Sequence, residues 1–387
     1  MNLVLLARTL YSPLERVDRP VVRIEDGLVA NISSAEAAEI PKGHRVVDFG
    51  DAVLVPGFID MHIHGGGGRD VMETDSAALP TVERLLYAHG VTSYFPTTIT
   101  TSVERTLAAL EHLADEIEKP KNSFDDSRAK PAGIHLEGPF ISHARPGVHT
   151  RAELLPPTLE MFEKFWQASR GKIKIITIAP ELEGARAVIA EASQRGICVS
   201  MGHSDATLQE AQAGIAAGVR HATHTFNAMR PLEHRDPGII GAALMDERLS
   251  AEIIADGIHV DPLIVQLFLR VKGHNAAVLV TDGTAATGMP DGRYRLGSLE
   301  VEVKDGKCLH EGRLAGSVLT MDKAVRNIVK FTNCDLQLAV QLATLNPARA
   351  AKLPAHAGML VAGASADMVA LSSAGDVIQT IVRGRVA

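Results

Sequence analysis

Cysteine is scarce in this chain: its 387 residues include only Cys198, Cys308 and Cys334. An odd number of widely separated cysteines argues against a disulfide framework and against a cysteine-based zinc site. Aromatic residues are also few, at 4%, although 46% of the residues are hydrophobic. The hydrophobic core must therefore consist mainly of Val, Ile, Leu and Ala, which is typical of a large α/β protein.

Long apolar runs and cationic clusters are absent as well. No apolar run reaches the roughly 18 residues of a membrane-spanning helix, and the start, MNLVLLAR, lacks the charged region and cleavage site of a signal peptide. The net charge of -7, with no clustered Lys/Arg face, argues against nucleic acid or an anionic membrane as the main partner. We therefore expect a cytoplasmic protein.

The middle of the chain alternates between short apolar runs and stretches with helical spacing. Eight runs are predicted to be strands: Phe58–His64, Val91–Thr97, Gly133–Glu137, Ile173–Ala179, Ile197–His203, His221–His224, Ala251–Asp256 and Ala277–Asp282. Six stretches are predicted to be helices: Val82–His89, Val103–Lys119, Leu159–Ser169, Ala185–Arg195, Leu208–Ala217 and Pro262–Val271. This order predicts a parallel sheet closed into a (β/α)8 TIM barrel, with a doubly wound open sheet as the alternative. No G-x-G-x-x-G phosphate loop follows the first strand, which favours the barrel.

Both ends of the chain lack long helical patterns. A hairpin is expected at Val21–Glu25 and Leu28–Ile32, around an Asp26-Gly27 turn. Further short strands are expected in the C-terminal part at Met359–Val361, Asp367–Leu371 and Val377–Val382. We expect residues 1–55 and 356–387 to form one small β-sandwich domain beside a barrel domain of residues 56–355.

Two segments interrupt the barrel pattern. Arg293–Lys304, with a turn at Asp305-Gly306, is expected to form a hairpin-like insertion after the eighth strand. Residues 120–131 are polar and are expected to form a loop between two strand–helix units.

Two histidines, His62 and His64, lie one residue apart where the first predicted strand meets a run of four glycines. In an extended strand, residues i and i+2 point to the same face, so the two imidazoles can bind one ion. Alone, the pair can equally be ordinary polar residues beside a glycine turn. Its interpretation therefore depends on whether other strands end in the same way.

Several other predicted strands do end in imidazole or carboxylate side chains. The residues concerned are His135 and Glu137, His203, His221 and His224, Asp256 with His259 just beyond it, and Asp282. The carboxyl ends of barrel strands meet on one face, where active sites are built. Imidazole and carboxylate suit Zn²⁺ or Fe²⁺, so the sequence predicts a divalent metal site there.

Each of these residues also has a structural interpretation. His135 and His221 precede the strand ends and can be hydrogen-bonded core groups or supports for metal ligands. Glu137 can be a solvated loop residue, and Asp282 can be a turn aspartate. His203 can cap the following helix, although Ser or Asp beside it would do so better.

This mixture of residues suits hydrolysis. A bound metal lowers the pKa of a coordinated water to about 7 and polarises a carbonyl oxygen. A carboxylate such as Asp282 can accept the water's proton and deliver it to a departing nitrogen. Cleavage of an amide or a related C–N bond is therefore the chemistry that fits.

The assembled motifs resemble those of the amidohydrolase superfamily and, within it, of the N-acetylglucosamine-6-phosphate deacetylases. The pair His62-Ile63-His64 marks the superfamily. The segments H-L-E-G-P-F at 135–140, H-T-F-N-A-M at 224–229 and A-D-G-I-H at 255–259 are specific to the deacetylases. The resemblance spans almost the whole chain. It implies removal of the acetyl group from a sugar 6-phosphate, giving glucosamine 6-phosphate and acetate.

The resemblance also implies residue roles. Glu137, His203 and His224 would hold the main catalytic metal, and Asp282 would be the general base and then the acid. Substrate-binding roles fall on Val148, Asn227, Ala228, Arg235, Asp256, His259, Leu314, Ala315 and Gly316. In relatives the arginine corresponding to Arg235 reaches the neighbouring subunit's site, which implies a homodimer.

The number of metal ions depends on the first-strand histidines. Some family members replace them with Gln and Asn and use one metal. Here His62 and His64 are both present, so a second ion, shared through Glu137 and Asp282, is expected. The role of His149, in a substrate-side loop of relatives, stays open.

Other activities are compatible with the same superfamily. The galactosamine epimer is one alternative substrate, and cyclic amides or deaminase substrates are others. Cyclic-amide members usually carry a bridging carboxylated lysine, and no Lys stands at a predicted strand end here. A non-catalytic interaction protein would have lost metal ligands, and none is lost.

Overall fold

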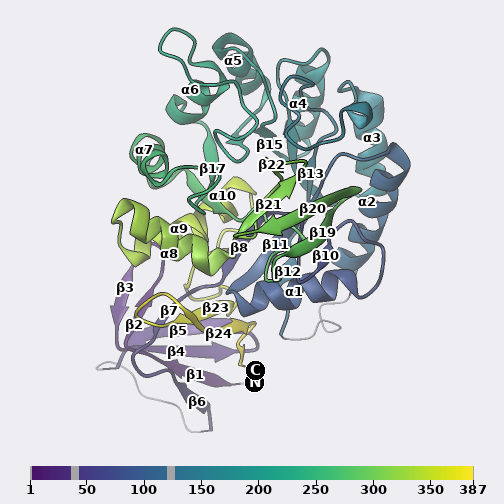
Figure 1. The fold of residues 1–387 in the computed structure, drawn as a ribbon. Coiled ribbons are helices and arrows are strands. Elements are labelled where there is room, and N and C mark those ends of the chain that lie inside the picture. Colours follow the sequence, from purple (N-terminus) through teal and green to yellow (C-terminus); the bar gives the residue numbers. More distant parts are fainter. Residues whose placement is uncertain (1, 36–42, 120–126, 387) are drawn as a thin grey trace.

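A closed barrel of parallel strands forms the body of the molecule (Figure 1), in a computed structural model that describes residues 2–35, 43–119 and 127–386. In barrel order its strands are β8 (Phe58–Ile63), β11 (Val91–Thr98), β13 (Ile134–Glu137), β14 (Ile173–Ile178), β15 (Cys198–Met201), β16 (His221–Ala222), β17 (Ser250–Ile254) and β18 (Ala277–Val280). Main-chain hydrogen bonds close the circle, since Asp282 N donates to His62 O at 2.9 Å and His64 N donates to Gly283 O at 2.7 Å. The TIM barrel is confirmed, and the open doubly wound sheet is wrong.

The six predicted helices are present, five of them with shifted ends and α5 with the predicted ends. They are α1 (Ala78–Ala88), α2 (Val103–Glu118), α3 (Leu159–Ala168), α4 (Ala185–Gln194), α5 (Leu208–Ala217) and α7 (Pro262–Lys272). Each lies outside the barrel and buries an apolar stripe against the strands, as Leu110 and Leu113 of α2 do.

Among the described residues, four further α-helices were not predicted. They are α6 (Gly238–Met245), α8 (Met321–Thr332), α9 (Leu336–Leu342) and α10 (Leu345–Ala350). Helix α6 is buried almost all round, so its sequence shows no amphipathic period. Helix α8 does bury residues at helical spacing, among them Met321, Val325 and Ile328, so the prediction missed a signal that was present.

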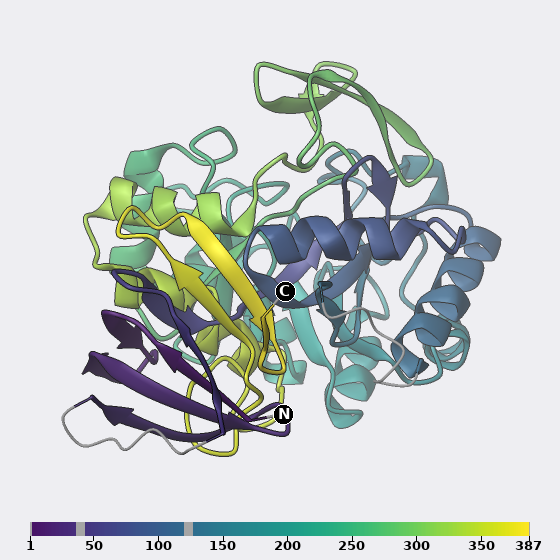
Figure 2. The same ribbon diagram turned by 90° about the horizontal axis from the view of Figure 1, so that it is seen from below.

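Strands from both ends of the chain form two sheets that share one core. The first sheet contains β5 (Leu28–Ser34), β4 (Pro20–Glu25), β1 (Leu3–Leu6) and β6 (Arg45–Asp48). The second contains β25 (Arg385–Val386), β24 (Val377–Val382), β23 (Met368–Leu371), β7 (Val53–Pro56), β2 (Thr9–Tyr11) and β3 (Arg16–Asp18). The antiparallel pair of β23 with β7 joins strands from the N-terminal and C-terminal parts of the chain, and the purple and yellow strands lie together in Figure 1 and Figure 2.

These sheets confirm the expected β-sandwich and the hairpin of β4 with β5. The strand predicted at Met359–Val361 is wrong: Gly358 and Gly363, with φ of 70° and 85°, turn the chain on either side of it. The division of the chain into domains at residues 55 and 356 stays a prediction.

The insertion after β18 is an antiparallel sheet of four strands. These are β19 (Gly292–Leu296), β20 (Leu299–Lys304), β21 (Lys307–His310) and β22 (Arg313–Leu314). The predicted hairpin and its Asp305-Gly306 turn are confirmed, with β21 and β22 in addition. Figure 1 shows this sheet in front of the barrel, so it covers the face that holds the strand ends.

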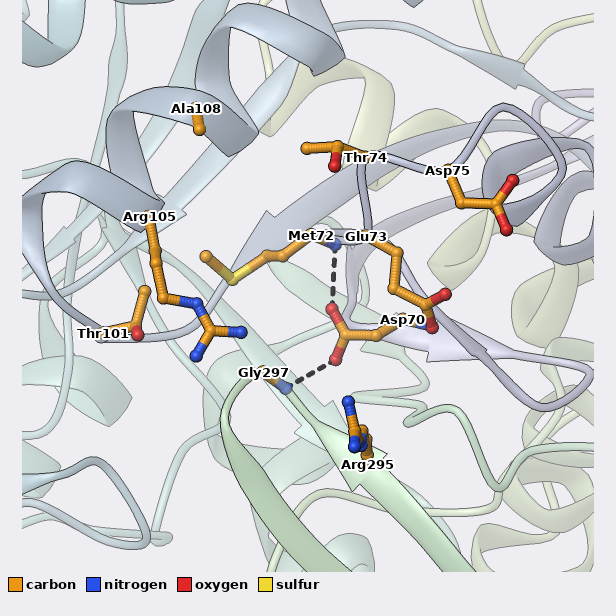
Figure 3. A pocket seen from close by; sticks show the side chains of 10 residues that line it. All are labelled: Asp70, Met72, Glu73, Thr74, Asp75, Thr101, Arg105, Ala108, Arg295 and Gly297. Atoms are coloured by element: carbon orange, nitrogen blue, oxygen red, sulfur yellow. Dashed lines mark hydrogen bonds between the residues drawn. The ribbon is translucent and has the colours of Figure 1, made fainter.

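A buried carboxylate ties the insertion to the barrel. After β8 come β9 (Gly65–Gly66) and β10 (Arg69–Asp70). Asp70 accepts hydrogen bonds from Met72 N at 2.8 Å and from Gly297 N at 2.7 Å (Figure 3). Gly297 forms the turn between β19 and β20, so Asp70 holds that turn against the loop that follows β8.

The polar loop predicted at 120–131 lies partly outside the described residues, at 120–126. Its last two residues form β12 (Lys130–Pro131), which pairs with β11, so this end is not a loop. Among the described helices, none has the length and apolar character that a membrane span requires.

Candidate metal and catalytic site

Glu137, the last residue of β13, lies at the centre of a buried histidine cluster at the carboxyl ends of the strands. Its Oε1 is 3.3 Å from His203 Nε2 and 3.2 Å from His224 Nε2, and these two nitrogens are 3.0 Å apart. Tetrahedral ligands at 2.0–2.1 Å from a zinc ion lie about 3.3 Å from one another. The three atoms thus have the spacing of ligands around one cation, and we name this set the first metal position.

A second set of atoms surrounds the other side of Glu137. Asp282 Oδ1 is 3.2 Å from His64 Nε2 and 3.5 Å from His62 Nε2. Glu137 contributes to this set too, since its Oε2 is 3.3 Å from His64 Nε2 and its Oε1 is 3.4 Å from His62 Nε2. His62, His64 and Asp282 form the second metal position, with Glu137 between the two positions.

Three atoms in this cluster lack the partners that buried polar atoms normally have. His62 Nε2, Glu137 Oε1 and His224 Nδ1 are buried and make no hydrogen bond. Such orphaned atoms are rare in folded proteins, and the first two lie beside other donor atoms that metals prefer. The residues present therefore fit a divalent metal ion.

The electrostatics of the cluster favour ionised carboxylates. Burial opposes their ionisation, but the neighbouring histidines outweigh it, so the pKa of Glu137 lies well below its usual range and that of Asp282 falls to about 2. Burial and the nearby His149 lower the pKa of His203 to about 4. Burial also opposes the charged form of His64, yet Asp282 and Glu137 raise its pKa to about 9. Anionic carboxylates thus stand ready to pair with a cation.

The main chain is strained where it presents these side chains. His203, His224 and Asp282 have φ angles of 47°, 25° and 50°. Positive φ is uncommon outside glycine and costs on the order of 1–3 kcal/mol per residue. In each case the residue follows a barrel strand, and the turn directs its side chain into the barrel mouth. Strain of this kind concentrates at functional sites.

A cavity of about 140 Å³ lies over the cluster, between the strand ends and the insertion. Six of the predicted substrate residues line it: Val148, Asn227, Ala228, His259, Leu314 and Gly316. Asp256 acts behind His259, because its Oδ2 lies 2.7 Å from His259 Nδ1.

Two predicted substrate residues lie away from this cavity. Ala315 is buried in the small core under the insertion, so it supports its neighbours on the cavity wall. Arg235 is exposed on the loop before α6 and is not among the residues that line the cavity.

The structural interpretations of three histidines are now decided. His135 is a core group, with Nε2 at 2.8 Å from Thr177 Oγ1 and Nδ1 at 3.2 Å from Met61 O. His221 is also buried and contacts Ser250 Oγ at 2.6 Å. His203 does not cap α5, since the side chain of Thr207 does so.

Two residues of the cluster were missed or left without a role. Glu252, inside β17, contacts His62 and His221 and is completely buried. A lone carboxylate within the apolar run Ser250–Ile254 was the available signal. His149 Nε2 lies 3.6 Å from Glu137 Oε2, and its Nδ1 is 2.7 Å from Thr100 Oγ1. Its loop position gave no strand-end signal.

Known proteins are similar to this chain in sequence and in fold. The family model described as the amidohydrolase family matches residues 53–387. An N-acetylglucosamine-6-phosphate deacetylase of Lysinibacillus sphaericus is 37% identical over 388 aligned residues, covering 100% of this chain and 98% of the relative. An N-acetylgalactosamine-6-phosphate deacetylase of Escherichia coli O157:H7 is 35% identical and covers 100% of both chains.

A solved structure agrees with these relatives. The N-acetylglucosamine-6-phosphate deacetylase of Mycobacterium smegmatis, in a mutant form in complex with N-acetylglucosamine 6-phosphate, superposes with a TM-score of 0.92 at 34% identity. The match covers 100% of this chain and 99% of that one. The chain belongs to the amidohydrolase family.

Proposed function

We propose that this protein is a metal-dependent deacetylase that hydrolyses N-acetylglucosamine 6-phosphate to glucosamine 6-phosphate and acetate. The observation that carries the proposal is Asp282, whose Oδ1 lies 3.2 Å from His64 Nε2 on the wall of the cavity over the Glu137 cluster. Relatives that share the whole chain length act, by name, on the same class of substrate.

The metal would be held by the two positions described above. Glu137, His203 and His224 would bind the first ion, and His62, His64 and Asp282 the second. A divalent cation bound there supplies a Lewis acid that lowers the pKa of water and polarises the acetyl carbonyl. Zn²⁺ and Fe²⁺ are the ions we propose, because the donors are imidazole and carboxylate without sulfur.

Asp282 would move the proton. The low pKa of its carboxylate keeps Oδ1 unprotonated at neutral pH, so it can accept a proton from the attacking water. It would then deliver that proton to the sugar nitrogen as the C–N bond breaks. Its depth in the cavity keeps bulk water from this exchange, since the side chain is buried.

Substrate recognition would use the cavity wall. Asn227 offers polar groups for the sugar, and Ala228, Leu314 and Gly316 leave room for the acetyl group. His259, held by Asp256, would hydrogen-bond the 6-phosphate. Val148 would contact the sugar from the loop after β13.

Arg235 would serve the phosphate of a neighbouring subunit, in a homodimer. It is exposed and lies outside the cavity of its own chain, while a guanidinium suits bidentate phosphate binding. Beside its loop lies an apolar surface over α6 and α7, where Leu232, Leu267 and Met245 are 49%, 45% and 72% exposed. Exposed apolar patches of this kind mark interfaces.

The cytoplasm is the compartment we propose. A sugar phosphate is charged and does not cross membranes unaided. The three cysteines are all unpaired, and Cys198 and Cys308 are buried thiols, as expected in a reducing compartment.

The galactosamine epimer is a second candidate substrate, because a relative named for it matches this chain along its full length. The two sugars differ only in the configuration of one hydroxyl group. A pocket that hydrogen-bonds that hydroxyl can discriminate strongly between them.

Acetate release from metal-loaded enzyme tests both proposals. N-acetylglucosamine 6-phosphate, its galactosamine epimer and unphosphorylated N-acetylglucosamine should be compared at equal concentration. We expect the first to turn over fastest and the unphosphorylated sugar slowest. Faster turnover of the galactosamine epimer would make it the preferred substrate in place of N-acetylglucosamine 6-phosphate. Equal turnover of the phosphorylated and unphosphorylated sugars would contradict the proposal that the site binds the 6-phosphate.

A further inference from the structure

Glu252 is a fully buried carboxylate beneath the metal histidines that has no place in the proposed reaction. Its Oε2 lies 3.0 Å from His62 Nδ1 and 2.9 Å from the main-chain nitrogen of His224. Its Oε1 lies 3.1 Å from His221 Nε2. One side chain thus contacts the ring of a ligand at the second metal position and the main chain of a ligand at the first.

The contact with His62 decides which ring nitrogen faces the metal. An ionised carboxylate only accepts hydrogen bonds, so His62 must carry its proton on Nδ1. With a metal bound, the lone pair would lie on Nε2, which is 3.4 Å from Glu137 Oε1 and 3.5 Å from Asp282 Oδ1 and has no hydrogen-bond partner. A carboxylate on the second nitrogen fixes both the ring orientation and the tautomer of a ligating histidine and raises its basicity.

The contact with His224 supports a strained turn. His224 has a φ of 25°, and its N–H donates to Glu252 Oε2. The next residue, Thr225, donates its N–H to the main-chain oxygen of Glu252 at 3.0 Å. Two hydrogen bonds to one residue of β17 therefore hold the main chain that places His224 Nε2 beside His203.

The charge of Glu252 also requires compensation. Across residues 2–35, 43–119 and 127–386, its ion-pair partners are His62 and His221, with no Lys or Arg among them. A buried carboxylate without a fixed cation is costly. A divalent ion on the histidines would place further positive charge one imidazole away.

We propose that Glu252 is a positioning residue that couples the two metal positions, by fixing the ring of His62 at the second and the main chain of His224 at the first. The proposal rests on the proposed metal-dependent function. It assigns the larger effect to the second position, because there Glu252 contacts a ligand's ring directly, whereas at the first position it contacts only the main chain.

The full-length variant Glu252→Gln tests this, with Glu83→Gln as the matched control. Glu83 is also a buried glutamate, on α1, and has no contact with the cluster. Zinc affinities are measured by competition with a chromophoric chelator, and bound zinc is counted by mass spectrometry. In Glu252→Gln we expect the second affinity to fall about 10- to 100-fold and the first to fall less, with both unchanged in the control.

The spectrum of the Co²⁺-substituted protein gives a readout that a merely structural role would not move. We expect altered d–d bands in Glu252→Gln. In Glu252→Asp we expect an intermediate affinity at the second metal position, because the aspartate keeps the negative charge on a side chain that is one methylene shorter. If Glu252→Gln does not fold, Glu252→Asp carries the test alone, with the second ion weakened more than the first.

Several results would overturn the proposal. They are unchanged affinities, equal loss of both ions together with loss of thermal stability, and a wild-type chain that binds one zinc only. A wild type that binds two ions but releases no acetate would instead overturn the proposed function, and the Glu252 assignment would stand on the affinities.

Discussion

Asp282 Oδ1 and His64 Nε2 lie 3.2 Å apart. His64 follows β8, the first barrel strand, and Asp282 follows β18, the last. Closure between β8 and β18 creates this pair, because His64 N donates to Gly283 O and Asp282 N donates to His62 O. The proposed proton carrier and the proposed second metal position are therefore built by one seam of the barrel. Substitutions at this seam should separate catalysis from metal binding.

Asp282→Asn should remove turnover while leaving the first metal in place. The amide retains the size of the side chain but cannot accept a proton, and positioned acid–base groups contribute roughly 10²–10⁴-fold to rate. We expect kcat to fall by at least that factor, with the zinc of the first position retained. Acetate release and zinc content, measured on the same sample, check this. Residual kcat above about a tenth of wild type would contradict the role of Asp282 as base and acid.

His62→Gln with His64→Asn should reduce the bound metal from two ions to one. The first position keeps Glu137, His203 and His224, whose donor atoms lie 3.0–3.3 Å apart without the first-strand histidines. We therefore expect stoichiometry to fall while measurable turnover persists. Zinc per subunit and kcat are the measurements. Loss of both ions would show that the two positions cannot be filled separately.

The residues of the proposed metal site were largely predictable because barrel geometry is simple. Glu137, His203, His224 and Asp282 each end an apolar run, and parallel strands in a barrel bring such ends together. Glu252 was not predicted because it lies inside its strand. The alternation of side chains along a strand does not by itself say which of them face the site and which face the helices.

Other features had no local signal at all. Helix α6 is buried almost all round and so lacks a periodic pattern. The approach of His149 to Glu137 depends on how the loop after β13 folds over Thr100, which spacing does not encode. The cover over the site likewise depends on long-range contacts, among them the hydrogen bond from Gly297 N to Asp70 and the small core beneath the insertion.

Asp70→Ala should loosen the insertion and weaken substrate binding. The variant removes the acceptor of the Gly297 and Met72 N–H groups, while Leu296, Leu314 and Gly316 of the insertion line the cavity. We expect KM to rise several-fold with a smaller change in kcat, since the Glu137 cluster is untouched. Asp75→Ala is the control, because Asp75 lies in the same loop but pairs with Arg69 (Figure 3 shows its carboxylate away from Gly297). Equal effects of the two variants would contradict a specific anchor.

Stability should fall as pH rises from about 5 to 7 because of Glu83. Burial raises the pKa of this carboxyl to about 7, against the ion pair from Arg128 and the hydrogen bond from Tyr94. A folded-state pKa above the unfolded value contributes stability below the unfolded pKa, which is lost as pH rises through the folded pKa. The loss is on the order of 2–3 kcal/mol at most. Glu83→Gln should flatten this part of the unfolding profile in urea, and an unchanged slope would contradict it.

Mixing the Asp282→Asn and Arg235→Ala variants should restore wild-type sites if Arg235 serves the partner's site. Asp282→Asn lacks the proton carrier, and Arg235→Ala lacks the phosphate contact; alone, the first should be inactive and the second should show a raised KM for the phosphorylated sugar. In a mixed dimer, one site combines the intact Asp282 of one subunit with the intact Arg235 of the other. Random exchange of equal amounts in a two-fold dimer should therefore make about a quarter of all sites wild-type. The kinetics at low substrate concentration, before and after subunit exchange in mild denaturant, measure this recovery. If Arg235 acted within its own chain, exchange would restore nothing, because no site would contain both residues.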